Sequence, residues 1–202
     1  MPFMSTQSTT YSDILQCART LIITGGYNSF SYADIAESVG IRKASIHHHF
    51  PTKADLVRVL VAQYREEAKA GMAALERYFP APVDQLKAYV GYWLECVGEA
   101  SKGYCVCALL ATQIPVLPTE VATEVRAHFR SLSAWITTVL ERGAQAGSLT
   151  LSDTPQAEAE RFMAAVHGAM LSARAYGEPG VFGLITQPLI DRLVTPIPPP
   201  GA

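Results

Sequence analysis

The chain has 202 residues, of which 49% are hydrophobic and 17% are charged, a composition that is typical of a packed globular protein and excludes a disordered one. Its formal net charge is −2, so any attraction to nucleic acid must come from a local basic patch. We find no secretion signal and no apolar run long enough to cross a bilayer, and the four cysteines are too few for a disulfide framework. We therefore expect a cytoplasmic protein with reduced thiols.

Helical periodicity runs along the whole chain, strand signals are nearly absent and no internal repeat occurs, so we predict an all-α fold. Ser31 and Thr52 are candidate amino-terminal caps, and Gly40 is a candidate carboxyl-terminal stop. Pro155 suits the first position of a helix, whereas Pro188 should kink or start the last helix. The helices are expected over about 10–24, 31–40, 43–48, 52–80, 83–99, 104–112, 119–147, 154–176 and 181–193.

Two short predicted helices, 31–40 and 43–48, are joined by a turn around Gly40, which is the arrangement of a helix-turn-helix motif. From Ile41 through Lys53 there are three cations and no carboxylate, as a phosphate-facing surface requires. For the charges alone, a solvated helix with a few charged residues is an equally good interpretation. The order of residue types decides between the two.

The stretch "FSYADIAESVGIRKASIHHHFPTKADLV" resembles the signature of TetR-type repressors, in which a helix-turn-helix leads into a His-Phe pair and a Lys a few residues later. Here these residues are His49, Phe50 and Lys53. The family usually has Tyr where this chain has His47, and often Ser or Thr where it has Arg42. The resemblance implies a helix-turn-helix DNA-binding domain over 1–52 and an effector-binding and dimerisation domain over 53–195, followed by a Pro-rich tail over 196–202.

We expect the second helix of the motif to face DNA. The three consecutive histidines cannot share one metal ion, because neighbouring helical side chains diverge by roughly 100°. Arg42 and Lys43 can reach guanine acceptors or phosphates, and Ala44 can contact a thymine methyl group. The further candidates are the donors His47 and His48 and the backbone anchors Tyr32, Ser45 and Lys53.

Other residues of the motif are expected to be structural. His49 and Phe50 should close the DNA-binding domain against the next helix. The candidate core residues are Ile35, Val39, Ile41, Ile46 and Phe50.

A stripe of small residues follows Pro155 at helical spacing and would let a partner helix approach closely. The family resemblance implies that the last two helices form a four-helix dimer bundle, and a dimer reads a palindromic operator. An intramolecular contact is the alternative use of this stripe. Its residues are Ala164, Gly168, Ser172 and Ala175.

The family resemblance also implies a small-molecule cavity among the helices of residues 83–176. Aromatic residues at helical spacing are more often core, and a hydrogen-bonded core histidine is the alternative for His167. The candidate effector-binding residues are Tyr89, Trp93, Cys105, Phe129, Met163, His167 and Met170.

Cys105 and Cys107 lie at a predicted helix start, where the helix dipole favours a thiolate. No second Cys/His pair has zinc-ligand spacing. The segment "GYCVCALLATQ" resembles the electrophile-sensing subgroup of TetR-type repressors, such as the regulator of N-ethylmaleimide reductase, and Cys105 falls on its sensing cysteine. The alternative is that both cysteines are small buried hydrophobic residues.

We therefore expect a homodimeric TetR-type transcriptional repressor, without a cofactor or metal, that releases its DNA operator when a small-molecule or electrophile effector binds. The predicted helix from Lys53 to Phe79 would join the two domains. One alternative is an enzyme using His128 or His167 as a base, but we find no nucleophile elbow, phosphate loop or metal box. The other is a small-molecule-binding helical module without DNA binding.

Overall fold

The computed structural model describes residues 6–98 and 104–194. These residues are mostly helical, and they contain no strand, only one antiparallel bridge between Leu149 and Val194. The predicted all-α fold is confirmed. No described helix is both long and apolar enough to span a membrane. The predicted tail at 196–202 lies outside the described residues. The elements are α1 (Thr6–Gly25), η1 (Tyr27–Ser29), α2 (Tyr32–Val39), α3 (Lys43–His49), α4 (Lys53–Tyr78), α5 (Pro82–Gly98), α6 (Val106–Ala111), η2 (Ile114–Val116), α7 (Thr119–Gln145), α8 (Pro155–Tyr176) and α9 (Gly180–Leu193).

The predicted helix ends are confirmed where a local capping residue defines them. The hydroxyl of Ser31 accepts a hydrogen bond from the amide of Ala33 at 3.1 Å, and the Asp34 carboxylate accepts one from the Ser31 amide at 2.6 Å, which forms a capping box before α2. Gly40 ends α2 in the left-handed conformation, with φ of 75°, which a residue with a Cβ rarely adopts. At the start of α8, the hydroxyl of Thr154 accepts a hydrogen bond from the amide of Ala157 at 3.2 Å and so caps this helix.

Some boundaries differ from the expected ones. Helix α1 begins at Thr6, earlier than expected. Helix α6 is only six residues long, and Pro115 lies in the separate 3-10 turn η2 that follows it. Pro188 does not start the last helix, because α9 already begins at Gly180 and continues past the proline to Leu193.

The chain folds into two compact units. Unit 1 consists of Met1–Glu67 and Tyr104–Phe129, and unit 2 consists of Ala68–Gly103 and Arg130–Ala202. These units are not the segments predicted from the sequence, because residues 104–129 pack with the amino-terminal helices. Where the functional domains divide remains a prediction.

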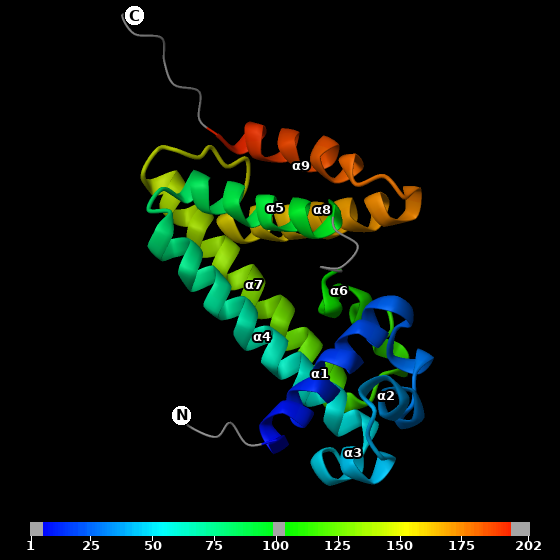
Figure 1. The fold of residues 1–202 in the computed structure, drawn as a ribbon. Coiled ribbons are helices and arrows are strands. Elements are labelled where there is room, and N and C mark those ends of the chain that lie inside the picture. The colour runs from blue at the N-terminus through cyan, green and yellow to red at the C-terminus, as the bar shows by residue number, and fades with distance from the viewer. Residues whose placement is uncertain (1–5, 99–103, 195–202) are drawn as a thin grey trace, which may run out of the picture. The chain divides into compact units, whose positions relative to one another are not determined.

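In unit 1, α1 packs against both α2 and α6, and α2 packs against α3 (Figure 1). The centre of this unit is apolar and inaccessible to solvent, with fully buried side chains that include Ile14, Ile22, Ile35, Ile46, Leu56, Val106 and Leu110.

In unit 2, α8 packs against α9 and α5 (Figure 1). Its core is built around Leu86, Ile136, Leu140, Phe162 and Phe182, each at most 1% exposed. Burial of such large apolar side chains contributes about 1.5–3 kcal/mol each to the free energy of unfolding.

Candidate nucleic-acid interface and effector site

Helices α2 and α3 form the helix-turn-helix expected from the sequence (Figure 1). The turn is closed by hydrogen bonds at 3.0 Å from the amides of Gly40 and Ile41 to the carbonyl oxygen of Ala36. Ile35 and Ile46 are fully buried and Phe50 is 2% exposed, whereas Val39 and Ile41 are half-buried. Because α3 is anchored through Ile46, most of its other side chains are left at the surface.

The exposed surface of α3, which we call the α3 face, consists of five residues, and Ser45 beside them is half-buried. Its cations and imidazoles can donate hydrogen bonds to phosphate oxygens and to base acceptors in a DNA groove. The nearby acid Asp34 has a lowered pKa, mainly because Ser31 donates hydrogen bonds to its carboxylate and also because of the charge of Lys43. The residues of the α3 face are Arg42, Lys43, Ala44, His47 and His48.

Two predicted backbone anchors make contacts inside unit 1. The Tyr32 hydroxyl donates a hydrogen bond to the Phe50 carbonyl oxygen at 2.9 Å, and burial raises the pKa of Tyr32 to about 12. The Lys53 ammonium donates to the Phe30 carbonyl oxygen and lies over the rings of Phe30 and Tyr27, with distances to their centroids of 4.0 and 4.8 Å. Burial lowers the pKa of Lys53. Both side chains therefore make contacts within unit 1, unlike the exposed side chains of the α3 face.

The end of α3 is held by aromatic contacts that the sequence pattern did not reveal. Tyr11 of α1 stacks on Phe50, with ring centroids 4.9 Å apart, and makes an edge contact with His49 at 5.8 Å. The His47 ring makes an edge contact with Tyr32 at 4.8 Å, and its Nδ1 lies 3.2 Å from the Pro51 carbonyl oxygen. These contacts fix the orientation of the imidazoles on α3.

The small-residue stripe on α8 is open in the single chain. Ala164, Gly168 and Ala175 are exposed and Ser172 is half-buried, and a Cβ built on Gly168 would meet nothing within 4 Å. Leu171, on the same helix, is 64% exposed. The opposite side of α8 is buried in unit 2, through Phe162, Val166, Ala169 and Ala173.

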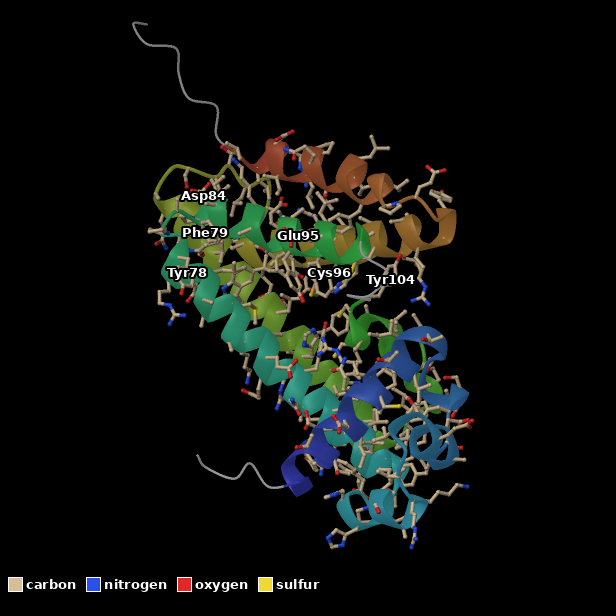
Figure 2. The ribbon with its side chains drawn as sticks, viewed as in Figure 1. Tyr78, Phe79, Asp84, Glu95, Cys96 and Tyr104 are labelled. Carbon is tan, nitrogen blue, oxygen red and sulfur yellow. The ribbon has the colours of Figure 1, made fainter. Side chains whose placement is uncertain are left out.

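Five of the seven predicted effector-binding residues lie in unit 2, namely Tyr89, Trp93, Met163, His167 and Met170, and the other two, Cys105 and Phe129, lie in unit 1. Helix α5 has a buried face that carries Tyr89, Trp93 and Cys96. Glu95, next to Cys96 on this helix, is exposed (Figure 2).

Trp93 and His167 each place a polar ring nitrogen in the interior of unit 2. The indole Nε1–H of Trp93 is buried and has no hydrogen-bond partner among the described residues. Burial lowers the pKa of His167 to about 4, so this imidazole is neutral near pH 7. Tyr89 lies between Trp135 and Phe162, with ring centroids at 5.7 and 6.4 Å. An unsatisfied buried donor beside aromatic side chains suits a ligand that accepts a hydrogen bond.

Cys105 and Cys107 are buried, with exposures of 1% and 0%. Burial raises the pKa of the Cys105 thiol, although a hydrogen bond from Tyr64 partly opposes this effect, and burial raises the pKa of Cys107 well above its ordinary value. The expectation that the helix start lowers these pKa values is therefore wrong, because loss of hydration outweighs the dipole of so short a helix.

A small surface hollow of about 50 Å³ lies in unit 1 between α1 and α4. Arg19 and Glu67 form an ion pair at 3.2 Å at its edge, and Arg19 stacks on Tyr64. Ligand sites usually have volumes of about 300–1,000 Å³, and none of the predicted effector residues lines this hollow. We therefore do not assign the effector site to it.

Two family models match the chain. One is described as "Bacterial regulatory proteins, tetR family" and matches residues 14–60, which contain the helix-turn-helix. The other is described as "Tetracyclin repressor-like, C-terminal domain" and matches residues 82–187. A comparison with curated protein sequences finds no match.

Several solved structures are similar over nearly the whole chain. A TetR-family transcriptional regulator from Agrobacterium tumefaciens is 62% identical over 94% of this chain and 100% of that chain, with a TM-score of 0.92. A TetR regulator from Legionella pneumophila is 23% identical over 96% and 100% of the two chains, with a TM-score of 0.83. The reduced form of E. coli NemR is 19% identical over 93% and 98%, with a TM-score of 0.81. The last two similarities show the fold alone.

Proposed function

Because the chain belongs to the TetR family of bacterial transcriptional regulators, we propose that it represses transcription by binding a palindromic operator as a homodimer and that a small molecule releases it. DNA binding, dimerisation and a response to small molecules are typical of this family. The observation that carries the proposal is the exposed α3 face on a helix-turn-helix whose other side is buried.

The α3 face has the chemistry of a groove-reading surface. Arg42 is the amino-terminal cap of α3 and Lys43 is its first residue, and both are exposed. Side chains at the start of a recognition helix are the ones that reach base edges in the major groove. Ala44, His47 and His48 continue the same surface. In the proposed complex, Arg42 and Lys43 contribute most of the affinity and Ala44 contributes to base preference.

A homodimer places two α3 faces on one DNA duplex. A single helix-turn-helix reads only a few base pairs, whereas two of them related by a twofold axis read half-sites about one helical turn apart. We assign the dimer interface to the open face of α8, with Ala164, Gly168 and Leu171. Leu184 on α9, the helix that packs against α8, is 74% exposed and is a further apolar candidate for this interface.

The effector site is proposed to be in unit 2, around Tyr89, Trp93 and His167. The free indole N–H of Trp93 and the neutral His167 favour an uncharged, largely apolar molecule with a hydrogen-bond acceptor. Such a ligand releases the operator if it prefers a conformation in which the two α3 faces are wrongly spaced, and operator DNA must then weaken ligand binding by the same factor.

The experiment that tests DNA recognition starts by selecting duplexes from a random pool with the purified full-length protein. Replacing Arg42 and Lys43 together by Ala should lower the affinity for a selected duplex at least about tenfold. The plot of log affinity against log salt concentration has a negative slope, and this slope should become less steep by about 2.

The control variant replaces the exposed Lys87 and Arg130 by Ala, which lowers the formal net charge from −2 to −4 as the test variant does. If the control loses as much affinity as the test variant, the contacts come from total charge and the proposed role of the α3 face is wrong. If the wild type selects no duplex, the proposal of operator binding is wrong.

A further inference from the structure

Residues 106–116, which contain α6 and η2, are connected to the junction between α1 and α2 through the side chain of Gln113. The Oε1 atom of Gln113 accepts a hydrogen bond at 2.8 Å from the backbone amide of Tyr27. Gln113 is half-buried and Tyr27 is 9% exposed, so this bond is partly shielded from water. A buried amide of this kind costs about 1–3 kcal/mol if its acceptor is removed.

The junction is shaped to receive this side chain. Gly26 has φ of +84°, a conformation that a residue with a Cβ rarely adopts, and a Cβ built there would lie 2.0 Å from the Nε2 atom of Gln113. The Gln113 amide therefore packs against the open face of Gly26 while its oxygen binds the next amide along the chain. Gln113 thus makes a van der Waals contact with Gly26 and a hydrogen bond with the amide of Tyr27 at the same turn.

The same junction holds the parts of unit 1 that carry the α3 face. The ring of Tyr27 lies under the ammonium of Lys53, the first residue of α4, and the Phe30 carbonyl oxygen accepts a hydrogen bond from that ammonium. Ser31 then caps α2. Displacement of the 26–30 junction would therefore move the start of α2 and the start of α4 together.

Helix α6, at the other end of the 106–116 segment, is held in place by packing. Val106, Cys107 and Leu110 of α6 are fully buried, and α6 packs on α1. Cys105, at the amino-terminal cap of α6, is hydrogen-bonded to Tyr64 of α4. A segment that is packed along its length transmits displacement instead of absorbing it.

We propose that Gln113 is a positioning residue for operator recognition, because it ties the 106–116 segment to the Gly26–Tyr27 turn and so fixes the orientation of α2 and α3. This inference rests on the proposed function. Selective binding to the operator needs a fixed orientation of α3, whereas binding to unrelated DNA needs only exposed cations. Loss of the Gln113 contact therefore lowers selectivity and leaves binding to unrelated DNA unchanged.

The test compares three variants of the full-length protein on a duplex selected with the wild type and on an unrelated duplex of the same length. Gln113→Met keeps the length of the side chain and removes the acceptor. Gln113→Glu keeps an acceptor oxygen for the Tyr27 amide. Thr112→Ala is the matched control, because Thr112 is exposed and its hydroxyl bonds only to the Leu109 carbonyl oxygen among the described contacts.

We expect Gln113→Met to lower the ratio of selected to unrelated affinity by roughly 2- to 30-fold, with faster hydrogen exchange at the Tyr27 amide. Gln113→Glu and Thr112→Ala should keep the wild-type ratio. A purely structural role would lower the melting temperature without changing this ratio in the folded protein. If Gln113→Met does not fold, Gln113→Ala replaces it.

Equal ratios for Gln113→Met and Thr112→Ala would overturn the inference and leave the proposed function intact. An equal loss of affinity on both duplexes would also overturn it. Failure of the wild type to select any duplex would overturn the proposed function, and the inference with it.

Discussion

Tyr64 on α4 and Cys105 before α6 are hydrogen-bonded to each other in the interior of unit 1, and burial raises the pKa of both groups. A thiol in this state is a poor nucleophile, since the thiolate is the reactive form. This arrangement bears directly on the hypothesis that Cys105 senses electrophiles.

We predict that N-ethylmaleimide at pH 7 labels the half-buried Cys17 before Cys105 in the native protein. Tyr64→Phe should slow labelling of Cys105 further, because it removes the hydrogen bond that lowers the pKa of this thiol. Time-resolved peptide mass spectrometry measures both rates. Cys105 labelled first would contradict the prediction, and an electrophile response that survives Cys105→Ser would exclude sensing by this thiol.

His167 should make unit 2 sensitive to acid. Its folded-state pKa of about 4 lies below the ordinary value of 6.5, so its contribution to stability is present above pH 6.5 and is lost as the pH falls toward 4. The contribution is at most about 3 kcal/mol. We expect urea unfolding curves to show a fall in the free energy of unfolding between pH 6.5 and 4, and His167→Gln should reduce it.

The matched control for this prediction is His48→Gln, because His48 is exposed on α3. This variant should keep the wild-type dependence of the unfolding free energy on pH. An unchanged dependence in His167→Gln would show that other groups cause the loss of stability.

Glu158 should be a main source of stability at the amino-terminal end of α8. Its side chain is 2% exposed, and its Oε1 atom accepts hydrogen bonds from Ser152 at 2.7 Å and from Arg161 at 3.0 Å. Arg192 of α9 lies 3.9 Å from Oε2. Glu158→Ala removes the acceptor of the Ser152 and Arg161 hydrogen bonds. Because Arg161 and Arg192 are more than half exposed and become hydrated, the free energy of unfolding should fall by about 1–3 kcal/mol.

Chemical denaturation measures this loss, with the exposed Glu178→Ala as the control, for which the expected change is within about 0.5 kcal/mol. A loss for Glu158→Ala no larger than that of the control would mean that the buried carboxylate contributes no net stability.

Gly168 distinguishes an intermolecular use of the α8 stripe from an intramolecular one. A Cβ at this position meets nothing within the chain, so Gly168→Glu should preserve the fold of the single chain but place a charge in the proposed dimer interface. We expect light scattering to show monomers and the affinity for a selected duplex to fall at least about tenfold.

Ala144→Glu, a change at another exposed position of unit 2, should leave the dimer intact. A Gly168→Glu protein that remains dimeric would place the interface elsewhere.

The sequence by itself determined the helices and the identity of the α3 face. Helix capping by Ser31 and Thr154 depends on residues within a few positions of each other, as does the left-handed turn at Gly40. These helix ends can therefore be predicted from the order of residues along the chain. The exposure of Arg42 and Lys43 follows in the same way, from the spacing of the buried residues on either side.

Only the tertiary structure decided how the remaining groups are used. Lys53 and Tyr32 have side chains of the type that binds phosphate groups, yet their polar atoms donate hydrogen bonds to carbonyl oxygens inside unit 1. The pKa of Cys105 is raised because burial removes its hydration, and Gln113 is hydrogen-bonded to Tyr27, a residue distant in sequence. Desolvation and pairing of this kind depend on which distant segments meet, and the spacing of residues along one helix carries no information about that.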